Sequence, residues 1–244
     1  MDFKFTIIYD NSKDNKTLQE GFGFSCLIEW ENKKILFDTG NDQIAFFSNI
    51  KKLNINLKNI THVIFSHKHN DHTAGLGEVL NNISSNVLVY FPDDFPDSLL
   101  KQVPTNVFPK IMDSFIEIYE NTYSLIMAGK YHGSIIHEQS VIFDTPKGLI
   151  VLTGCAHPGI LNILKIVKEK FPAKKIHITM GGFHLYKSWR FISSGVVRQF
   201  KKVGVEKVIP CHCTGEIASE QFRKNFKENY IKAGTGTIIK VKFE

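Results

Sequence analysis

Short apolar runs separated by polar turns make up the first part of the chain and predict mainly strands. Residues 24–30 and 33–37 flank the pair Glu31-Asn32, which is typical of a β-hairpin. Residues 41–53 differ, because apolar side chains recur there every three or four positions and so favour a helix. The run 60–65 is β-branched and too short for a helix, so we expect it to be a buried strand.

The same periodicity predicts the remaining elements. The further predicted strands are residues 3–9, 87–91, 111–119, 123–128, 140–143, 149–152, 175–180, 207–209 and 237–243. The further predicted helices are residues 73–81, 160–171, 188–203 and 216–230. Residues 10–21 are polar and predict a loop, whereas residues 92–109 hold four prolines and predict an excursion that forms a lid or a wall for substrate.

One internal similarity indicates how these elements are organised. The hairpin ending in Asp38-Thr39-Gly40 resembles the hairpin ending in Thr153-Gly154, and each is followed by a predicted helix and a strand that leads to a histidine. The first half reaches His67 in this way and the second reaches His184. This similarity predicts two ββαβ halves packed sheet against sheet with helices outside, and chance similarity between two hairpins is the alternative.

Four metal-ligand side chains stand directly after the predicted strand 60–65. They are His67, His69, Asp71 and His72. His67 and His69 can converge on one metal ion, while Asp71 and His72 can turn toward a second. Imidazole nitrogen with one carboxylate suits zinc, iron or manganese rather than calcium or magnesium. The alternative is a polar loop that happens to hold three histidines.

The composition excludes several classes of protein. With 43% hydrophobic and 22% charged residues, the 244-residue chain matches a globular protein that can bury a full core. No apolar run approaches the ~20 residues of a membrane span, and the N-terminus lacks the pattern of a signal peptide. Four unevenly spaced cysteines indicate no disulfide framework, so we expect a cytoplasmic protein with reduced thiols and no membrane partner.

The net charge of +6 can attract an anionic partner. The lysines are scattered in pairs, and no basic arm or basic–aromatic interleaving is present, so a solvated surface explains them better than nucleic-acid binding does. We therefore expect an anionic small-molecule substrate, and the sequence leaves the oligomeric state open.

The pattern His-x-His-x-Asp-His resembles the signature of the metallo-β-lactamase-fold superfamily. The resemblance implies an α/β fold, a four-layer αββα sandwich of two similar halves with a one- or two-metal site at one edge, and a single domain over residues 1–244. Further motifs resemble the subgroup of dihydropterin ribofuranosyl-aminobenzene phosphate synthase-like proteins, or metal-dependent hydrolases of β-lactamase superfamily II. These motifs are Asp-Thr-Gly, Gly-Cys-x-His-x-Gly-Ile, Gly-Gly-Phe-His-Leu and His-Cys-Thr-Gly, between Asp38 and Gly215.

The resemblance also implies a ligand set for two divalent ions, with zinc favoured and iron or manganese possible. His67, His69 and His157 are the implied ligands of the first ion, and Asp71, His72 and His212 those of the second. The superfamily's usual Gly-His-x-Pro-Gly motif before the second hairpin is not recognisable, which leaves His137 as an alternative to His157.

Three further residues resemble parts of the superfamily site. Cys155 falls where the superfamily often has a bridging aspartate, or a cysteine in true β-lactamases, and is expected to touch metal or substrate. Asp38 resembles an early aspartate that orients the histidine loop, although a turn-forming aspartate is an equal alternative. His184 follows Gly181-Gly182, which leave room for substrate.

The expected reaction is hydrolysis, because no serine or cysteine nucleophile motif is present. A metal-bound hydroxide would attack an ester, lactone, amide or phosphoester, with Asp71 orienting it and His184 donating a proton or holding an anionic oxygen. Lys187 and Arg190 would hold a substrate phosphate or carboxylate, or are simply a solvated helix start. An iron-dependent oxidoreductase acting on oxygen or thiols is the alternative, and a non-catalytic metal-binding module is a third.

Overall fold

The computed structural model describes residues 2–243 and divides into two compact units. Unit 1 comprises the described residues up to Asp113 together with those from Ala233 onward, and unit 2 comprises Ser114–Lys232. Each unit is built on one β-sheet and has its own hydrophobic core.

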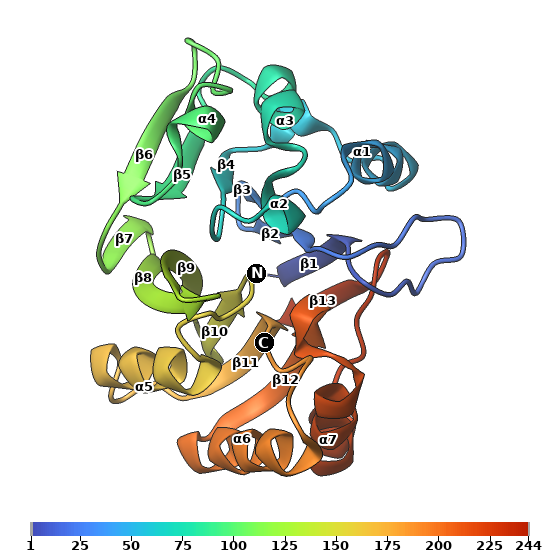
Figure 1. Cartoon of the computed structure of the whole chain (residues 1–244), viewed down its shortest axis with the longest axis vertical. Coiled ribbons are helices and arrows are strands. Elements are labelled where there is room, and N and C mark those ends of the chain that lie inside the picture. Colours follow the sequence, from blue (N-terminus) through green and yellow to red (C-terminus); the bar gives the residue numbers. More distant parts are fainter. Residues whose placement is uncertain (1, 244) are drawn as a thin grey trace. The chain divides into compact units, whose positions relative to one another are not determined.

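Unit 1 contains a seven-stranded sheet in the order β13-β1-β2-β3-β4-β5-β6 (Figure 1). The strands are β1 (Asp2–Tyr9), β2 (Ser25–Trp30), β3 (Lys33–Phe37), β4 (His62–Ile64), β5 (Leu88–Pro92), β6 (Phe108–Met112) and β13 (Ile238–Lys242). Pairing is antiparallel from β13 to β3 and parallel from β3 to β6. The carboxyl ends of β3, β4 and β5 therefore share one edge of this sheet.

Helices cover one face of the unit 1 sheet. They are α1 (Gln43–Lys52), α2 (Asn70–Thr73), α3 (Leu76–Asn82) and α4 (Asp97–Leu100), with a 3₁₀ turn at Leu57–Asn59. The Asp42 carboxylate accepts the Ala45 amide and starts α1. Apolar residues of α1 and α3 pack against alternate strand residues such as Leu36, Val63 and Val89, and this burial fixes the sheet on which the histidine loop stands.

Unit 2 contains a six-stranded sheet in the order β12-β11-β10-β9-β8-β7. The strands are β7 (Ile116–Tyr119), β8 (Thr122–Tyr131), β9 (Ser134–Thr145), β10 (Gly148–Thr153), β11 (Ile176–Gly182) and β12 (Val205–Cys211). The helices are α5 (Ile160–Lys170), α6 (Arg190–Val203) and α7 (Glu216–Phe226), with 3₁₀ turns at His212–Thr214 and Lys227–Asn229. All three helices contribute to one core with strand residues such as Val151, Ile176 and Val208.

The two units repeat one topology, as the internal similarity predicted. In unit 1 the antiparallel pair β2-β3 is followed by α1 and the parallel strand β4, and in unit 2 the pair β9-β10 is followed by α5 and β11. β5 and β12 then add in parallel to β4 and β11. The α/β fold with two sheets and two similar halves is thus confirmed, and the sequence motifs stand after equivalent strands.

Several predicted boundaries are wrong. The predicted strand 111–119 is two strands, β6 and β7, because the division between the units falls at Asp113. The predicted helix 73–81 is two helices, α2 and α3, divided at Gly75. The predicted helix 216–230 ends at Phe226, where Lys227 takes a positive φ of 50° that an α-helix does not accept.

The hairpin of β8 and β9 is longer than its apolar pattern indicated. The predicted strand 140–143 extends over Ser134–Thr145, and residues 123–128 extend to Tyr131. Polar residues such as Glu138 and Gln139 lie buried in β9, which masked the alternation. The excursion 92–109 contains the single-turn helix α4, and its role as a lid or a wall for substrate stays a prediction. None of the helices in residues 2–243 has the length and apolar character needed to cross a membrane.

One buried histidine in unit 1 makes stability depend on pH. His62 is 4% exposed and stacks on Tyr90 with 6.2 Å between ring centroids. Burial, and secondarily the charge of Lys33, lowers the pKa of His62 from 6.5 to about 4. The unfolded chain therefore binds the proton more readily, so stability falls as pH decreases from about 6.5 to about 4.

We expect His62→Phe to flatten this dependence. The substituted ring keeps the stacking but cannot take a proton, so the melting temperature should change less than that of the wild type between pH 7 and pH 4.5. Thermal unfolding of both proteins at the two pH values measures the difference. An equal decrease of the melting temperature in both proteins would show that other titratable groups cause the pH dependence of stability.

Candidate metal centre

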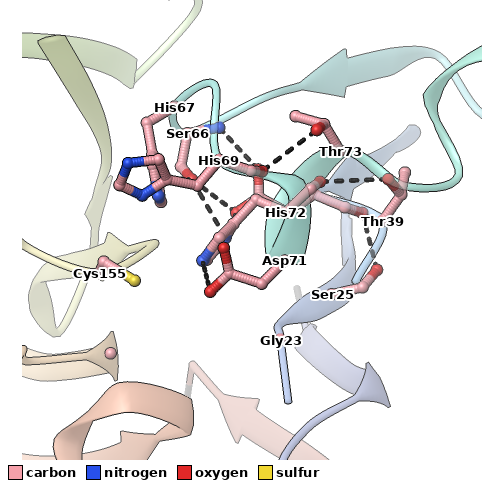
Figure 2. A network of polar contacts seen from close by, with 12 residues as sticks. Gly23, Ser25, Thr39, Ser66, His67, His69, Asp71, His72, Thr73 and Cys155 are labelled. Carbon is pink, nitrogen blue, oxygen red and sulfur yellow. Dashed lines mark hydrogen bonds and ion pairs between the residues drawn. The ribbon is translucent and has the colours of Figure 1, made fainter. Parts of the chain in front are cut away.

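The histidine loop of unit 1 directly follows β4, at the edge where β3 and β5 also end. Figure 2 shows the side chains of this loop, His67, His69, Asp71 and His72. His69 precedes the single turn α2, and this turn brings Asp71 and His72 back toward His67. The His67 ring centroid lies 4.8 Å from that of His69 and 4.2 Å from that of His72. These side chains therefore gather on one loop at a strand end in unit 1, as the sequence predicted.

Asp38, directly after β3, anchors this loop by hydrogen bonds of its carboxyl group. Its Oδ1 accepts the Ser66 amide at 2.6 Å, and its Oδ2 accepts the Ser66 hydroxyl at 2.6 Å and His72 Nδ1 at 2.7 Å. Complete burial raises the pKa of the Asp38 carboxyl group, while the charge of His72 and the hydrogen bonds from His72 and Ser66 oppose this rise. Since Nδ1 of His72 is engaged, the ring directs Nε2 toward Asp71, whose Oδ2 lies 3.6 Å away.

The backbone of the loop is held by the turn that contains Asp38. The Thr39 amide and hydroxyl donate to the His72 carbonyl at 2.8 and 3.1 Å, and the Thr39 hydroxyl accepts the Gly75 amide at 3.0 Å. Asp38 itself adopts a left-handed conformation with φ of 55°. The Asp-Thr-Gly motif thus orients His72 and also forms the turn that fixes the backbone around it. Asp38 therefore has both of the roles that the sequence had left as alternatives, orienting the histidine loop and forming a turn.

Unit 2 brings together a second group of ligand-type side chains. One ligand atom each from Cys155, His157 and His184 lies within 4.8 Å of the others. Cys155 and His157 follow β10, and His184 follows the neighbouring strand β11. The His157 and His184 ring centroids are 4.7 Å apart. His184 thus lies beside His157 in this unit, where the sequence had left its contacts open.

Glu138 anchors the second group, and sequence reasoning missed it. This β9 carboxylate is 1% exposed and accepts the amides of Cys155, Ala156 and His157 at 2.7, 2.7 and 2.8 Å. Its Oε2 also lies 2.8 Å from His157 Nδ1. The sequence gives no local signal for it, because Glu138 precedes the predicted strand 140–143 and stands between the polar residues His137 and Gln139. Glu138 holds His157 as Asp38 holds His72.

The electrostatics of Glu138 differ from those of Asp38. Burial acts to raise the pKa of Glu138, but the side-chain and backbone hydrogen bonds of His157 and the amide of Ala156 lower it to about 2. Glu138 is therefore a carboxylate at neutral pH and favours an Nδ1–H tautomer of His157, which directs Nε2 away from the strand. The alternative ligand His137 is the neighbour of Glu138 on β9, and its side chain belongs to the opposite face of the sheet.

His212 follows β12, the next strand along the same sheet edge as His184. Both residues adopt left-handed backbone conformations, with φ of 44° and 52°. Gly182 allows the end of β11 to lie close to Gly154 and Cys213, because a Cβ at this position would lie 2.4 Å from the Gly154 carbonyl oxygen and 2.6 Å from Cys213 Sγ. Strained backbone at strand ends is a common feature of functional sites.

The neighbouring residue Cys213 adds a second thiol to this group. Its Sγ lies 3.5 Å from the Cys155 carbonyl oxygen. Burial acts to raise the pKa of Cys213, but hydrogen bonds with the Cys155 and His184 side chains lower it well below its usual value. The sequence had not singled out Cys213.

The two cations that the sequence predicted to bind substrate, Lys187 and Arg190, are both exposed. Lys187 lies just before α6, and Arg190 is the first residue of α6. Lys187 Nζ lies 5.1 Å from the centroid of the Tyr186 ring. The sequence prediction that they contact substrate stays a prediction.

The donor set fits a transition metal. Each unit contains a buried histidine whose Nδ1 is bound to a buried carboxylate, which is the arrangement that fixes the tautomer of metal-ligating imidazoles. Nitrogen, carboxylate and thiol donors suit zinc and its neighbours better than magnesium or calcium.

Comparisons with known proteins agree with this chemistry. The family model of the metallo-β-lactamase superfamily matches residues 18–98. The chain is 29% identical to 7,8-dihydropterin-6-methyl-4-(β-D-ribofuranosyl)-aminobenzene-5'-phosphate synthase of Methanocaldococcus jannaschii, with 97% of this chain and 95% of the relative covered.

Solved structures show the same fold. The crystal structure of Tm1679, a metal-dependent hydrolase of the β-lactamase superfamily, is 29% identical with a TM-score of 0.82, covering 99% of this chain and 100% of that one. The metallo-β-lactamase fold protein YhfI from Bacillus subtilis is 13% identical with a TM-score of 0.72, covering 99% and 100%. The two sheets, the repeated topology and these similarities together show a mixed α/β fold that matches structures of the metallo-β-lactamase superfamily.

Proposed function

We propose that the protein is a metal-dependent hydrolase of a small anionic ester, lactone, amide or phosphoester. The observation that carries the proposal is the pair of carboxylate-held histidines, Asp38–His72 in unit 1 and Glu138–His157 in unit 2. Burying two carboxylates costs free energy, and two such arrangements at strand ends favour metal binding over a structural role.

The ligands follow from the motifs. We assign His67, His69 and His157 to one divalent ion and Asp71, His72 and His212 to a second, with zinc as the favoured metal. Cys155 adds a thiol donor beside His157. When bound, such ions acidify water and polarise the bond that is broken.

The residues of the chain would then perform distinct tasks. The Asp71 carboxylate orients the attacking water and accepts its hydrogen bond. Asp38 and Glu138 keep His72 and His157 in the Nδ1–H tautomer throughout the reaction, since both carboxylates are buried and fully hydrogen-bonded. The His184 imidazole, beside His157, donates a proton to the leaving group or holds an anionic oxygen.

The related proteins support an anionic substrate. The structural relative of 29% identity is described as a metal-dependent hydrolase, and the name of the archaeal relative specifies a phosphate-bearing product. Because that relative is a synthase, transfer to an acceptor other than water is a second candidate reaction for this chain. The surplus of positive charge, +6, suits an anionic substrate in either case.

Metal analysis combined with a substrate panel tests the proposal. Protein grown with zinc, iron and manganese is expected to carry up to two equivalents of metal and to hydrolyse at least one phosphoester, lactone or thioester in a chelator-sensitive manner. Absence of stoichiometric metal under every condition would overturn the proposal. Iron content with oxygen consumption and no hydrolysis would instead establish the oxidoreductase alternative.

His184→Ala tests the assignment of the proton donor. We expect this variant to keep its metal and to lose on the order of 10²-fold in kcat, which is the lower range for a general acid–base group. Rate and metal content are measured on the same preparations. Loss of metal together with activity would make His184 a ligand, and an unchanged rate would remove it from the site.

A further inference from the structure

The seven residues Tyr186–Ile192, which we name the 186–192 surface, place large apolar side chains in solvent. Tyr186, Trp189, Phe191 and Ile192 expose 38%, 74%, 71% and 42% of their surface. A cluster of large exposed apolar side chains is uncommon on a soluble protein and marks a binding surface. The 186–192 surface begins two residues after His184.

Backbone contacts hold the 186–192 surface against the candidate metal centre of unit 2. The amides of Leu185 and Tyr186 both donate to the Cys213 carbonyl oxygen, at 3.0 and 3.1 Å. A Cβ at Gly215 would lie 2.5 Å from the Tyr186 Cα, so the backbone segments around Gly215 and Tyr186 are in direct contact. The Tyr186 ring centroid lies 5.7 Å from that of His184. The surface is therefore positioned relative to His184 and is not a detached loop.

Cations are interleaved with these aromatic rings. Lys187 stands between Tyr186 and Trp189, and Arg190 between Trp189 and Phe191. The first turn of α6, residues 190–193, contains no acidic residue. Aromatic faces suit a planar ring, while the cations suit a phosphate or carboxylate. A second copy of the chain fits less well, because a two-fold interface centred on this segment would gather four cations in one patch with no acidic residue of the segment to pair with them.

Resting on the proposed function, we propose that the 186–192 surface is the substrate-recognition element of the site and selects a substrate with an aromatic or heteroaromatic ring and an anionic group. Trp189 stacks on the ring, because it exposes the largest aromatic face of this segment. Lys187 and Arg190 bind the anionic group. Tyr186 continues the aromatic surface toward His184, which places the scissile bond beside the imidazole.

The chain itself provides a spectroscopic reporter. It contains two tryptophans, of which Trp30 is 4% and Trp189 is 74% exposed. A ring that stacks on Trp189 should therefore change the fluorescence of the exposed tryptophan while Trp30 stays shielded. The probes are phenylphosphonate and cyclohexylphosphonate, which carry the same anionic group but differ in whether the ring has a π-face. Neither contains an ester bond, so binding is measured without turnover.

Zinc-loaded protein is titrated with both probes by calorimetry and by fluorescence. We expect phenylphosphonate to bind on the order of 10-fold more tightly than cyclohexylphosphonate, which corresponds to one aromatic stacking contact. Trp189→Ala should remove the preference for phenylphosphonate and the fluorescence change, whereas Arg190→Gln should lower the affinity for both probes. Ile238→Ala is the control, since Ile238 is also a large exposed apolar residue, 53%, but lies on β13 of unit 1 and should leave both affinities unchanged.

Equal affinities for the two probes, or an unchanged preference in Trp189→Ala, would overturn the inference. A dimer in sedimentation that Trp189→Ala dissociates would also overturn it and identify the surface as a subunit interface. The result is separable from the proposed function. A Trp189-dependent preference without any hydrolysis would reject only the hydrolase, and hydrolysis without the preference would reject only the recognition surface.

Discussion

His69→Ala and Asp71→Ala are each expected to reduce hydrolysis to the level of protein-free buffer while the protein still unfolds cooperatively. Both side chains are assigned as metal ligands and belong to the loop that follows β4. Neither is part of the unit 1 core, which is formed by apolar residues of the sheet, α1 and α3. Side chains on a loop supported by a rigid sheet can be removed with little effect on the core.

Asn70→Ala is the matched control for these two variants. Asn70 lies between the two ligands on the same loop and is exposed, and its amide nitrogen contacts only the neighbouring Asn41 side chain among the hydrogen bonds described. We expect it to keep both activity and metal. Activity, bound zinc and thermal unfolding are measured for all three variants. If both ligand variants lost cooperative unfolding while the control kept it, the metal would be mainly structural.

Glu138→Ala is expected to have the largest effect on stability. It would leave three buried backbone amides and the His157 Nδ1–H without their acceptor. Each buried donor that loses its partner costs roughly 1–3 kcal/mol, and removing one partner of a buried ion pair costs roughly 3–5 kcal/mol, so with four donors affected we expect a loss of about 4 kcal/mol or more in the free energy of unfolding. Because His157 also loses its orientation, zinc affinity should fall by roughly 10- to 100-fold.

Urea unfolding of the metal-free protein and competition with a zinc chelator measure these two effects separately. Glu138→Gln keeps the volume but not the charge, so it should recover part of the stability and little of the zinc affinity. Glu206→Gln is the control, because Glu206 also accepts a histidine, His177, but at the start of β11 and with an exposed side chain. It should leave zinc affinity unchanged. A normal zinc affinity in both Glu138 variants would make this carboxylate purely structural.

The sequence by itself determined the order of elements around the candidate metal centre. The strand before His67, the helix after Gly159 and the strand before His184 are local patterns, and local hydrophobic periodicity is sufficient to predict them. The density of ligand types in residues 67–72 likewise predicted metal chemistry without any knowledge of packing. The repeated hairpins predicted the two similar halves, because each hairpin is a short-range feature written in consecutive residues.

Only the tertiary structure identified Glu138 as the carboxylate that holds His157, and only it showed that Asp38 contacts His72. Glu138 and His157 are 19 residues apart, and Asp38 and His72 are 34 apart, so no local periodicity relates either pair. Strand pairing creates both contacts. Pairing of β3 with β4 places Asp38 beside the loop after β4, and pairing of β9 with β10 places Glu138 beside the loop after β10. The same dependence on neighbouring strands explains the misplaced strand and helix ends, since an element ends where its packing partners end.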